Sequence, residues 1–265
     1  MTGGGSGLGR AMALALASAG ADVAIAGRKP EPIAKTAHQI RSLGRQAIPV
    51  AVDLTDTAAV DDLFSRVTDT WGGVDVLINN AGLVANQGGT AIWDVTDYQW
   101  RNGIEGILGP SFYCSRAIAR QMAERGSGKI VNIASGLGMR GARDNYMYAC
   151  AKGAVIQLTR SLAVSLGHHG VTANCITSGY VPTEGTLQSS MSLPRAEFVP
   201  LGRLGKPKDL GPLAVWLASA ASNYVTGAVI AIDGGGLAGG IAPTGHAPLF
   251  RPSALQQRKD SIQSG

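Results

Sequence analysis

The chain has 265 residues, enough for one large domain with a substantial core. Its 45% hydrophobic residues, 15% charged residues and 37 glycines are typical of a compact α/β protein with close helix packing. No apolar run is long enough to span a membrane. The formal net charge of +5 is not gathered into a dense basic stripe, so we expect no nucleic-acid binding. Cys114, Cys150 and Cys175 lie far apart without metal-ligand spacing, which predicts reduced thiols in a cytoplasmic protein and no metal site.

A glycine-rich turn, "TGGGSGLG" from Thr2 to Gly9, opens the chain and leads directly into a helical pattern. Gly3, Gly7 and Gly9 fit T-G-x-x-x-G-x-G, in which backbone amides can approach a pyrophosphate at a helix N-terminus. Glycine turns also serve as plain turns, so this motif is weak alone. The stretch after Arg10 imitates a short signal peptide, but the helical spacing of its apolar residues favours a helix.

Short runs rich in Val and Ile alternate with longer helical patterns along the chain. The predicted strands are 21–26, 47–52, 74–79, 129–134, 171–176 and 228–232. The predicted helices are 8–19, 31–43, 58–71, 98–124, 146–166 and 207–218. This alternation predicts a doubly wound parallel sheet of Rossmann type, with helices on both faces. We expect a single domain over residues 1–237 and a polar tail rich in Gly and Pro over residues 238–265.

The ends of successive predicted strands carry residues suited to a dinucleotide. Gly27 and Arg28 stand about 20 residues past the glycine turn, where a carboxylate would otherwise bind an adenosine ribose. A guanidinium there favours a 2′-phosphate. Asp53 and Leu54 end the next strand, where an adenine edge would be met, and "NNAG" over residues 79–82 ends another. Each alone has an ordinary interpretation as turn chemistry, but their succession predicts a cofactor site.

A candidate catalytic pair lies in "YACAK", which places Tyr148 and Lys152 four residues apart on one helix face. An ammonium group beside a phenol stabilises the phenolate and lowers its pKa, which suits acid–base catalysis. An ordinary surface pair is the alternative. Ser135 follows a predicted strand thirteen residues earlier and could hold a substrate carbonyl. There is no G-x-S-x-G elbow, which argues against a serine hydrolase.

Taken together, these motifs resemble the classical short-chain dehydrogenase/reductase family from Thr2 to about Gly236. The resemblance rests on motifs in the family's order and spacing: "TGGGSGLG", "DL" at Asp53, "NNAG", Ser135, "YACAK", "SGYVPT" and "YVTGAVIAIDGG". It implies Tyr148 as general acid–base, Lys152 binding the nicotinamide ribose, and Ser135 orienting the carbonyl or alcohol. It also implies that Val181 and Thr183 hold the carboxamide and that hydride passes to or from nicotinamide C4.

The resulting cofactor set joins the glycine turn, the strand ends and the catalytic helix. Its members are Gly3, Ser6, Gly7, Leu8, Gly9, Arg28, Asp53, Leu54, Asn80, Ala81, Gly82, Tyr148, Lys152, Val181 and Thr183. Arg28 after Gly27 is similar to the pattern of NADP-preferring members, whereas Ser6 stands where such members often have a basic residue. The predicted cofactor is NADP, with NAD as the less favoured alternative.

Three features depart from the family pattern. Ile107 stands at the position of the family's catalytic asparagine and cannot donate or accept the hydrogen bonds of a proton relay. Asn102 lies five positions earlier, so we expect it to face elsewhere. Ser178 replaces the proline of a Pro-Gly pair, which should loosen the loop over the nicotinamide.

The largest departure is that only Met1 precedes the glycine turn, so the family's first strand is expected to be missing. That strand lies mid-sheet, and without it its two neighbours would leave backbone polar groups unsatisfied. A late recorded start, a sheet repaired by another segment and a degenerate inactive relative would each explain this; the first is favoured because Ser135, Tyr148 and Lys152 are intact.

The sequence therefore predicts an oxidoreductase that transfers a hydride between NADP(H) and a ketone or secondary alcohol. The alternative is a nucleotide-binding scaffold or regulatory relative with impaired catalysis, suggested by Ile107 and by the missing first strand. The segment 184–200 resembles the family's variable substrate lid, and the substrate is a small molecule whose identity the sequence leaves open. By resemblance, the long helices should form a homodimer or homotetramer.

Overall fold

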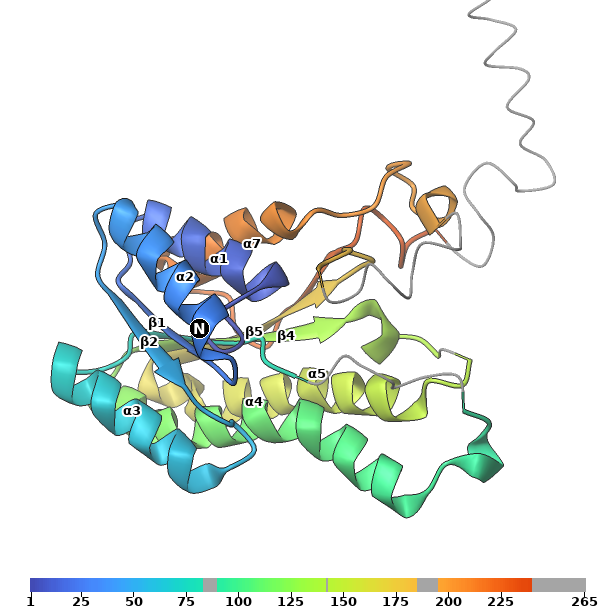
Figure 1. Cartoon of the computed structure of the whole chain (residues 1–265), viewed down its shortest axis with the longest axis horizontal. Coiled ribbons are helices and arrows are strands. Elements are labelled where there is room, and N and C mark those ends of the chain that lie inside the picture. The colour runs from blue at the N-terminus through green and yellow to red at the C-terminus, as the bar shows by residue number, and fades with distance from the viewer. Residues whose placement is uncertain (83–89, 142, 185–194, 240–265) are drawn as a thin grey trace, which may run out of the picture.

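The structure is a computed structural model that describes residues 1–82, 90–141, 143–184 and 195–239. Most of the predicted tail, from residue 240 on, and most of the predicted lid, 185–194, lie outside the described residues. The architecture has three layers, with parallel strands between two layers of helices (Figure 1). No helix of the described residues is both long and apolar enough to cross a membrane.

Six strands of the described residues run parallel in two hydrogen-bonded groups. The first group pairs β1 (Val23–Gly27) with β2 (Ala47–Ala51). The second has the order β3 (Val76–Asn79), β4 (Gly128–Ser135), β5 (Val171–Ser178) and β6 (Val229–Ile232). Because all strands are parallel, their carboxyl ends meet at one edge, where ligands bind in open α/β sheets.

Met1 and Thr2 lie between the two groups and join them. The Ala26 amide donates to Met1 O at 3.0 Å, and the Gly3 amide donates to Ala26 O at 2.8 Å. On the other side, the Thr2 amide donates to Ile78 O at 3.0 Å. The expectation that β1 and β3 lack a common neighbour is therefore wrong at the end nearest the glycine turn.

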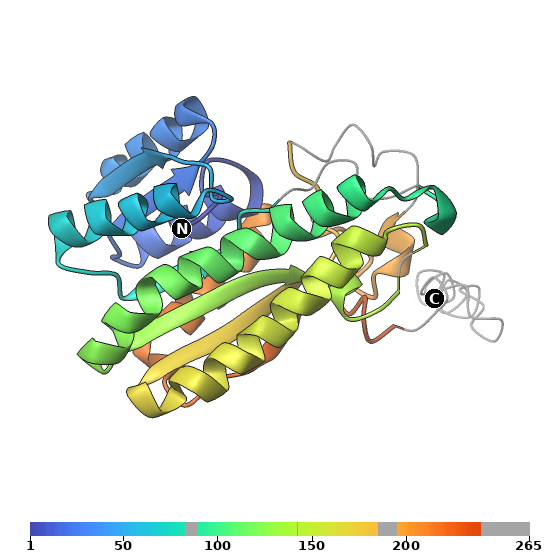
Figure 2. The ribbon, with the colours of Figure 1, turned by 90° about the horizontal axis from the view of Figure 1, so that it is seen from below.

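Helices cover both faces of the sheet (Figures 1 and 2). One face carries α1 (Gly7–Ser18), α2 (Pro30–Ser42) and α7 (Gly211–Ala218). The other carries α3 (Thr57–Trp71), α4 (Asp97–Arg125) and α5 (Tyr146–Leu166). Each layer buries its own apolar cluster against the strands: Met12, Ile25 and Ile40 on the first face, Leu63, Ile118 and Ile130 on the second.

Short 3₁₀ turns connect several of these elements. They are η1 (Ile92–Asp94), η2 (Gly136–Gly138), η3 (Gly167–His169), η4 (Arg195–Phe198), η5 (Pro207–Leu210) and η6 (Ala220–Ser222). The continuous helix predicted over 207–218 is divided between η5 and α7, because Gly211 and Pro212 open a new helix. Elsewhere the predicted helices are confirmed within one residue at each end.

A buried polar network fixes the end of β3. Asn79 is 1% exposed, and its Nδ2 donates to Asn132 Oδ1 on β4 at 2.9 Å and to Ser115 Oγ on α4 at 3.0 Å. Asn132 in turn donates to Thr159 Oγ1 on α5 at 2.9 Å. Since a buried polar group is costly unless paired, these bonds specify how β3, β4, α4 and α5 fit together. The strand end that carries Asn80 is held in place by them.

Candidate active site

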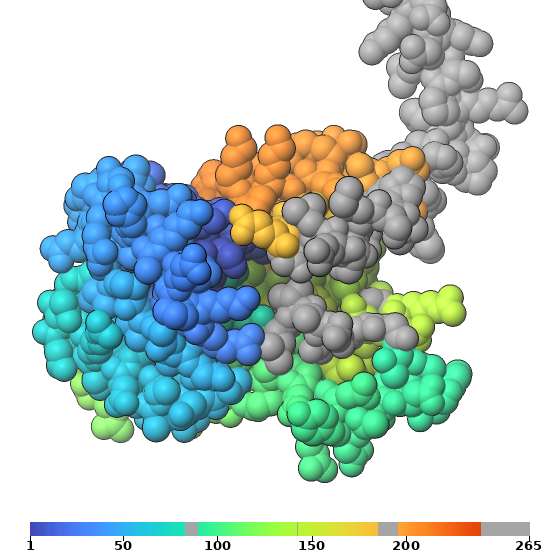
Figure 3. Space-filling view, in the orientation of Figure 1, coloured from blue at the N-terminus to red at the C-terminus, as the bar shows by residue number. Residues whose placement is uncertain are grey.

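A cleft of about 1690 Å³ runs along the carboxyl ends of the strands. It is larger than a typical small-ligand pocket of about 300–1,000 Å³, and has room for a dinucleotide with a substrate. Figure 3 shows the two helix layers in the orientation of Figure 1, with blue and orange segments above and green segments below. Fifteen of the predicted site residues line it: Gly3, Ser6, Gly7, Leu8, Arg28, Asp53, Leu54, Asn80, Ala81, Gly82, Ser135, Tyr148, Lys152, Val181 and Thr183.

The glycine turn forms one wall of the cleft at the start of α1. Ser6 precedes the helix with an extended backbone, and its side chain makes no capping hydrogen bond. The first-turn amides of an α-helix have no partner within the helix and attract anions. Gly7 has φ +52, a conformation that favours glycine, and a Cβ there would lie 3.1 Å from Thr183 Cγ2. The turn has no side-chain cap and no side chain at Gly7, so a pyrophosphate can approach its backbone amides.

Gly9 has a different role from the one predicted, because it does not line the cleft. A Cβ at Gly9 would collide with Gly3 O and would lie 2.5 Å from Asn80 Nδ2. The absent side chain therefore lets α1 pack closely against the turn and the β3 end.

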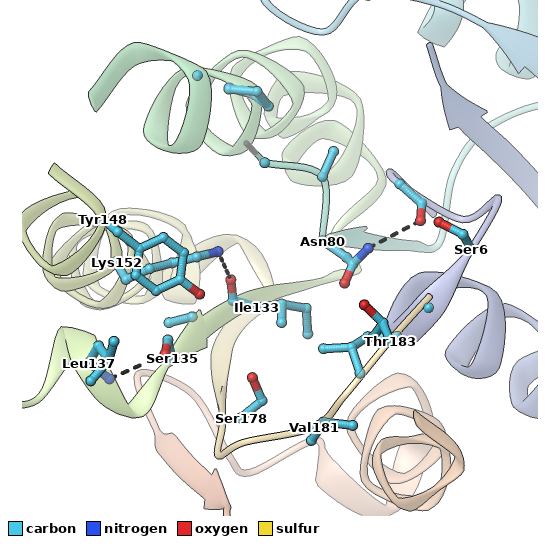
Figure 4. Close-up of a pocket in the computed structure, with 18 of the residues that line it drawn as sticks. Ser6, Asn80, Ile133, Ser135, Leu137, Tyr148, Lys152, Ser178, Val181 and Thr183 are labelled. Atoms are coloured by element: carbon cyan, nitrogen blue, oxygen red, sulfur yellow. Dashed lines mark hydrogen bonds between the residues drawn. The ribbon is translucent and has the colours of Figure 1, made fainter. Parts of the chain in front are cut away.

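Thr2 and Asn80 lock the turn onto the end of β3. Thr2 Oγ1 accepts hydrogen bonds from the Asn80 and Ala81 amides at 2.9 and 3.0 Å. Asn80 Nδ2 donates to Thr2 O at 3.2 Å and to Gly3 O at 3.3 Å (Figure 4). Four bonds between segments 78 residues apart make the glycine turn and "NNAG" one rigid wall.

The nucleoside end of the cleft combines Arg28, after β1, with Asp53, after β2. The Thr55 amide and hydroxyl both donate to Asp53 Oδ1, at 3.0 and 2.8 Å, and together with the charge of Arg28 they lower the pKa of Asp53. The Asp53 carboxylate is therefore ionised and already oriented. The exposed Arg28 guanidinium stands beside it at the mouth of the cleft.

The predicted catalytic side chains converge on the opposite wall (Figure 4). Tyr148 and Lys152 come from the first two turns of α5, and Ser135 ends β4. Lys152 Nζ lies 5.9 Å from the Tyr148 ring centroid and donates to Ile133 O at 2.8 Å. The Leu137 amide donates to Ser135 Oγ at 3.2 Å, so the Ser135 hydroxyl proton remains available to another oxygen.

Burial governs the protonation of this wall. It lowers the pKa of Lys152 from its ordinary 10.5 to about 8, because this residue is only 7% exposed. It raises the pKa of Tyr148, against the smaller opposing effect of a hydrogen bond with Ser135, so the predicted lowering of this pKa by Lys152 is wrong for the structure described here. At neutral pH the site therefore holds a protonated phenol beside a charged lysine.

Two residues of α4, Ile107 and Asn102, differ in their position relative to the cleft. Ile107 is fully buried and packs beside Gly82, outside the cleft lining. Asn102, expected to face elsewhere, does line the cleft, as do Glu105 and Gly106. The lining residues Asn102, Gly106 and Pro110 follow the spacing of one helix face, and Ile107 lies off that face. Asn102 therefore does face elsewhere than Ile107, but the direction in which it faces is the cleft.

Phe198, from the predicted lid, lines the far end of the cleft, but sequence reasoning missed three other residues there: Arg140, Asn145 and Leu237. Asn145 had one available signal, since Asn directly before a helix is a typical N-cap. Leu237 comes from beyond β6 and lies over Gly136, where a Cβ would be 3.6 Å from its Cδ2. Within the described part of the chain no cluster of His, Cys, Asp and Glu could hold a metal ion.

Comparison with known proteins agrees with this geometry. A family model described as Enoyl-(Acyl carrier protein) reductase matches residues 3–236. A crystal structure described as a short-chain type dehydrogenase/reductase, from Mycobacterium marinum, superposes with a TM-score of 0.84 and 34% identity, covering 89% of this chain and 93% of the other. This chain belongs to the short-chain dehydrogenase/reductase family. The predicted family and fold class are therefore confirmed, and the chain is an oxidoreductase that acts on CH–OH groups.

Two further short-chain relatives bear on the chemistry. The 2-dehydro-3-deoxy-D-gluconate 5-dehydrogenase of Dickeya dadantii is 35% identical over 209 residues, which is 77% of this chain and 81% of the relative. A solved structure from Agrobacterium tumefaciens with bound NADP is 36% identical, with a TM-score of 0.81, and the match covers 89% of this chain and 94% of the other.

Proposed function

We propose that this short-chain enzyme transfers a hydride between NADP(H) and a ketone or secondary alcohol, with Tyr148 as acid–base, Ser135 as orienting group and Lys152 as cofactor ligand. The observation that supports it most is the convergence of these three side chains on one wall of a cleft whose other wall is the glycine turn. NADP(H) would supply or accept the hydride.

The roles of the three side chains follow from their surroundings. Burial keeps the Tyr148 phenol protonated at neutral pH, so it can donate to a carbonyl oxygen. Ser135 accepts from the Leu137 amide and can donate its own proton to the same oxygen. Lys152 uses one N–H for Ile133 O, which leaves two donors for ribose hydroxyls. Its positive charge beside Tyr148 also stabilises the phenolate left after proton transfer.

The preference for NADP is proposed on the nucleoside end of the cleft. Arg28 follows β1 at the position where a carboxylate would repel a 2′-phosphate, and a guanidinium binds phosphate through paired hydrogen bonds. The relative from Agrobacterium tumefaciens that holds NADP supports the same choice.

A single substitution tests the catalytic role. Tyr148→Phe removes only the phenol oxygen, and general acid catalysis is worth about 10²- to 10⁴-fold, so ketone reduction should fall by that factor. Cofactor affinity, measured by nucleotide fluorescence, should change little. A folded Tyr148→Phe protein with full turnover would show that the proton comes from another group.

The second candidate, a cofactor-binding protein without turnover, is favoured by the apolar Ile107 at the position of the family's asparagine. It predicts nucleotide binding by the wild type but no reduction across a broad panel of carbonyl compounds. A slow but Tyr148-dependent reduction would instead support the enzyme.

We also propose a cytoplasmic homodimer or homotetramer assembled through α4 and α5. Phe112 on α4 and Val164 on α5 are 44% and 83% exposed, and such apolar side chains on long helices suit a subunit interface. Light scattering of the purified protein should give twice or four times the chain mass, whereas a monomer at micromolar concentration would contradict this.

A further inference from the structure

The substrate end of the cleft carries one cation that nothing in the described structure neutralises. Arg140 lines the cleft two residues after η2, and its guanidinium makes no hydrogen bond or ion pair with any residue in the described ranges. Of the other cations in the lining, Lys152 is bound to Ile133 O and Arg28 and Lys29 lie at the nucleoside end. The site proposed here rests on Arg140.

The acidic groups around this end of the cleft are already engaged. Glu105 accepts from the Tyr113 hydroxyl at 2.6 Å. Asp233 accepts from the Gly235 and Leu237 amides at 2.9 and 2.7 Å. Asp144, in the same loop as Arg140, is paired with Arg143 at 3.4 Å and accepts from Tyr146 at 3.2 Å. Among the described residues these carboxylates do not pair with Arg140, so its exposed guanidinium is available to an anionic ligand.

Arg140 also lies at a suitable distance from the reacting group. Only η2 and one further residue separate it from Ser135, so the two Cα atoms are at most about 13 Å apart. An extended arginine side chain spans roughly half of that distance. A small molecule whose carbonyl is held by Ser135 and Tyr148 can thus place a carboxylate on Arg140, whereas a longer tail would reach past it.

A second polar group stands beside Tyr148. Asn145 lines the cleft three residues before Tyr148, hence on the same side of the helix start. It occupies the N-cap position of α5 without making a capping hydrogen bond, and its Oδ1 is buried without a partner. A buried amide oxygen without a hydrogen-bond donor destabilises the protein. A ligand that donates a hydrogen bond to this oxygen removes that penalty and binds more tightly.

From these observations we propose that the substrate is a small oxo or hydroxy acid, whose carboxylate is bound by Arg140 and whose neighbouring hydroxyl is bound by Asn145. The inference rests on the proposed function, because it places the reacting carbonyl at Tyr148. Leu137 and Leu237 form the apolar side of the same space and would contact the carbon skeleton.

The test compares acids with their neutral counterparts. Oxo acids from levulinate to ketogluconates are each assayed against the corresponding methyl ester, for wild type and Arg140→Met. A hydrogen bond to a charged group is worth about 1.5–3 kcal/mol, so kcat/KM of the wild type for acid over ester should be about 10- to 150-fold, and Arg140→Met should lose that preference. Esters should be reduced equally by both proteins.

Two further variants separate charge recognition from general damage. Arg143→Met removes another exposed arginine of the same loop that lies outside the cleft lining, and it should leave the acid preference unchanged. Asn145→Leu should lower kcat/KM for hydroxylated acids but not for levulinate. Equal effects of Arg140→Met and Arg143→Met, or equal use of acid and ester by the wild type, would overturn the proposal.

Isothermal titration calorimetry measures binding to the proposed carboxylate site without requiring turnover. Nonreacting carboxylates, such as cyclohexanecarboxylate and gluconate, are titrated into the protein with NADP⁺. Binding that weakens about 10-fold or more in Arg140→Met supports the subsite even if no ketone is reduced, in which case only the proposed function fails. Acids that neither bind nor react, beside esters reduced through Tyr148, would remove the subsite and leave the proposed function standing.

Discussion

Replacing Lys152 by Met should make the folded protein more stable near neutral pH while abolishing its catalytic activity. Burial lowers the pKa of Lys152 from 10.5 to about 8, so keeping the ammonium in the folded state costs about 3 kcal/mol, at roughly 1.4 kcal/mol per unit. Met has a similar volume and no charge. It leaves Ile133 O without its donor, which costs about 1 kcal/mol. The variant should therefore gain about 2 kcal/mol in the free energy of unfolding at about pH 7.

The sign of the pH dependence follows from the lowered pKa. Below about pH 8 both folded and unfolded wild type carry the proton, and the whole penalty is present. Between about 8 and 10.5 the folded protein releases the proton that the unfolded chain keeps, so wild-type stability rises relative to Lys152→Met. About 2 kcal/mol of the difference should disappear between about pH 7 and about pH 9.5.

Urea unfolding followed by circular dichroism, without nucleotide, measures this difference. Lys35→Met, at an exposed position on α2, corrects for the general loss of one positive charge. A stability difference between wild type and Lys152→Met that is the same at both pH values would refute the reasoning, since it would mean that the folded protein does not penalise the Lys152 charge.

Four further outcomes are expected. Arg28→Ala should weaken NADPH binding by about 10- to 100-fold and NADH binding by less than about 3-fold, measured by nucleotide fluorescence, because only NADPH carries the 2′-phosphate. Gly7→Ala should lower both Tm and cofactor affinity, by about 1–2 kcal/mol of stability, since φ is +52 and the Cβ meets Thr183. Ile107→Asn should destabilise the fold by about 2–4 kcal/mol in urea unfolding, because it buries an amide in an apolar site. Ketone reduction at saturating cofactor should slow as the pH rises through about 8, where Lys152 loses its proton. A reduction rate that does not change up to about pH 10 would contradict this.

Much of the fold could be predicted because parallel strands buried on both faces leave a plain signature. The runs of Val and Ile at β1 to β6 and the helical periodicities between them located these elements within two residues at each end, except for the divided helix over 207–218. The motifs at strand ends also placed most of the cleft, since carboxyl ends of parallel strands share one edge. The position of Gly9 differed from the predicted one, at the cleft wall. In a sequence, a glycine needed for close backbone packing cannot be distinguished from one that faces a phosphate.

The substrate end could not be predicted in the same way. Arg140, Asn145 and Leu237 meet there from a loop, a helix start and the segment after β6, and no periodicity or spacing links them. The pairing of Met1 and Thr2 with their neighbours was missed for another reason. A strand is recognised from a run of residues, whereas two residues between β1 and β3 need only complete existing ladders of hydrogen bonds.

The most direct test of the central claim is transfer of deuterium to a ketone from NADPH that carries deuterium at both C4 positions, followed by mass spectrometry of the alcohol in wild type and Tyr148→Phe. The account predicts one deuterium on the carbinol carbon with the wild type, and transfer slowed about 10²- to 10⁴-fold in the variant at unchanged cofactor affinity. Label transfer at equal rates in the two proteins, or an alcohol formed without deuterium, would contradict it.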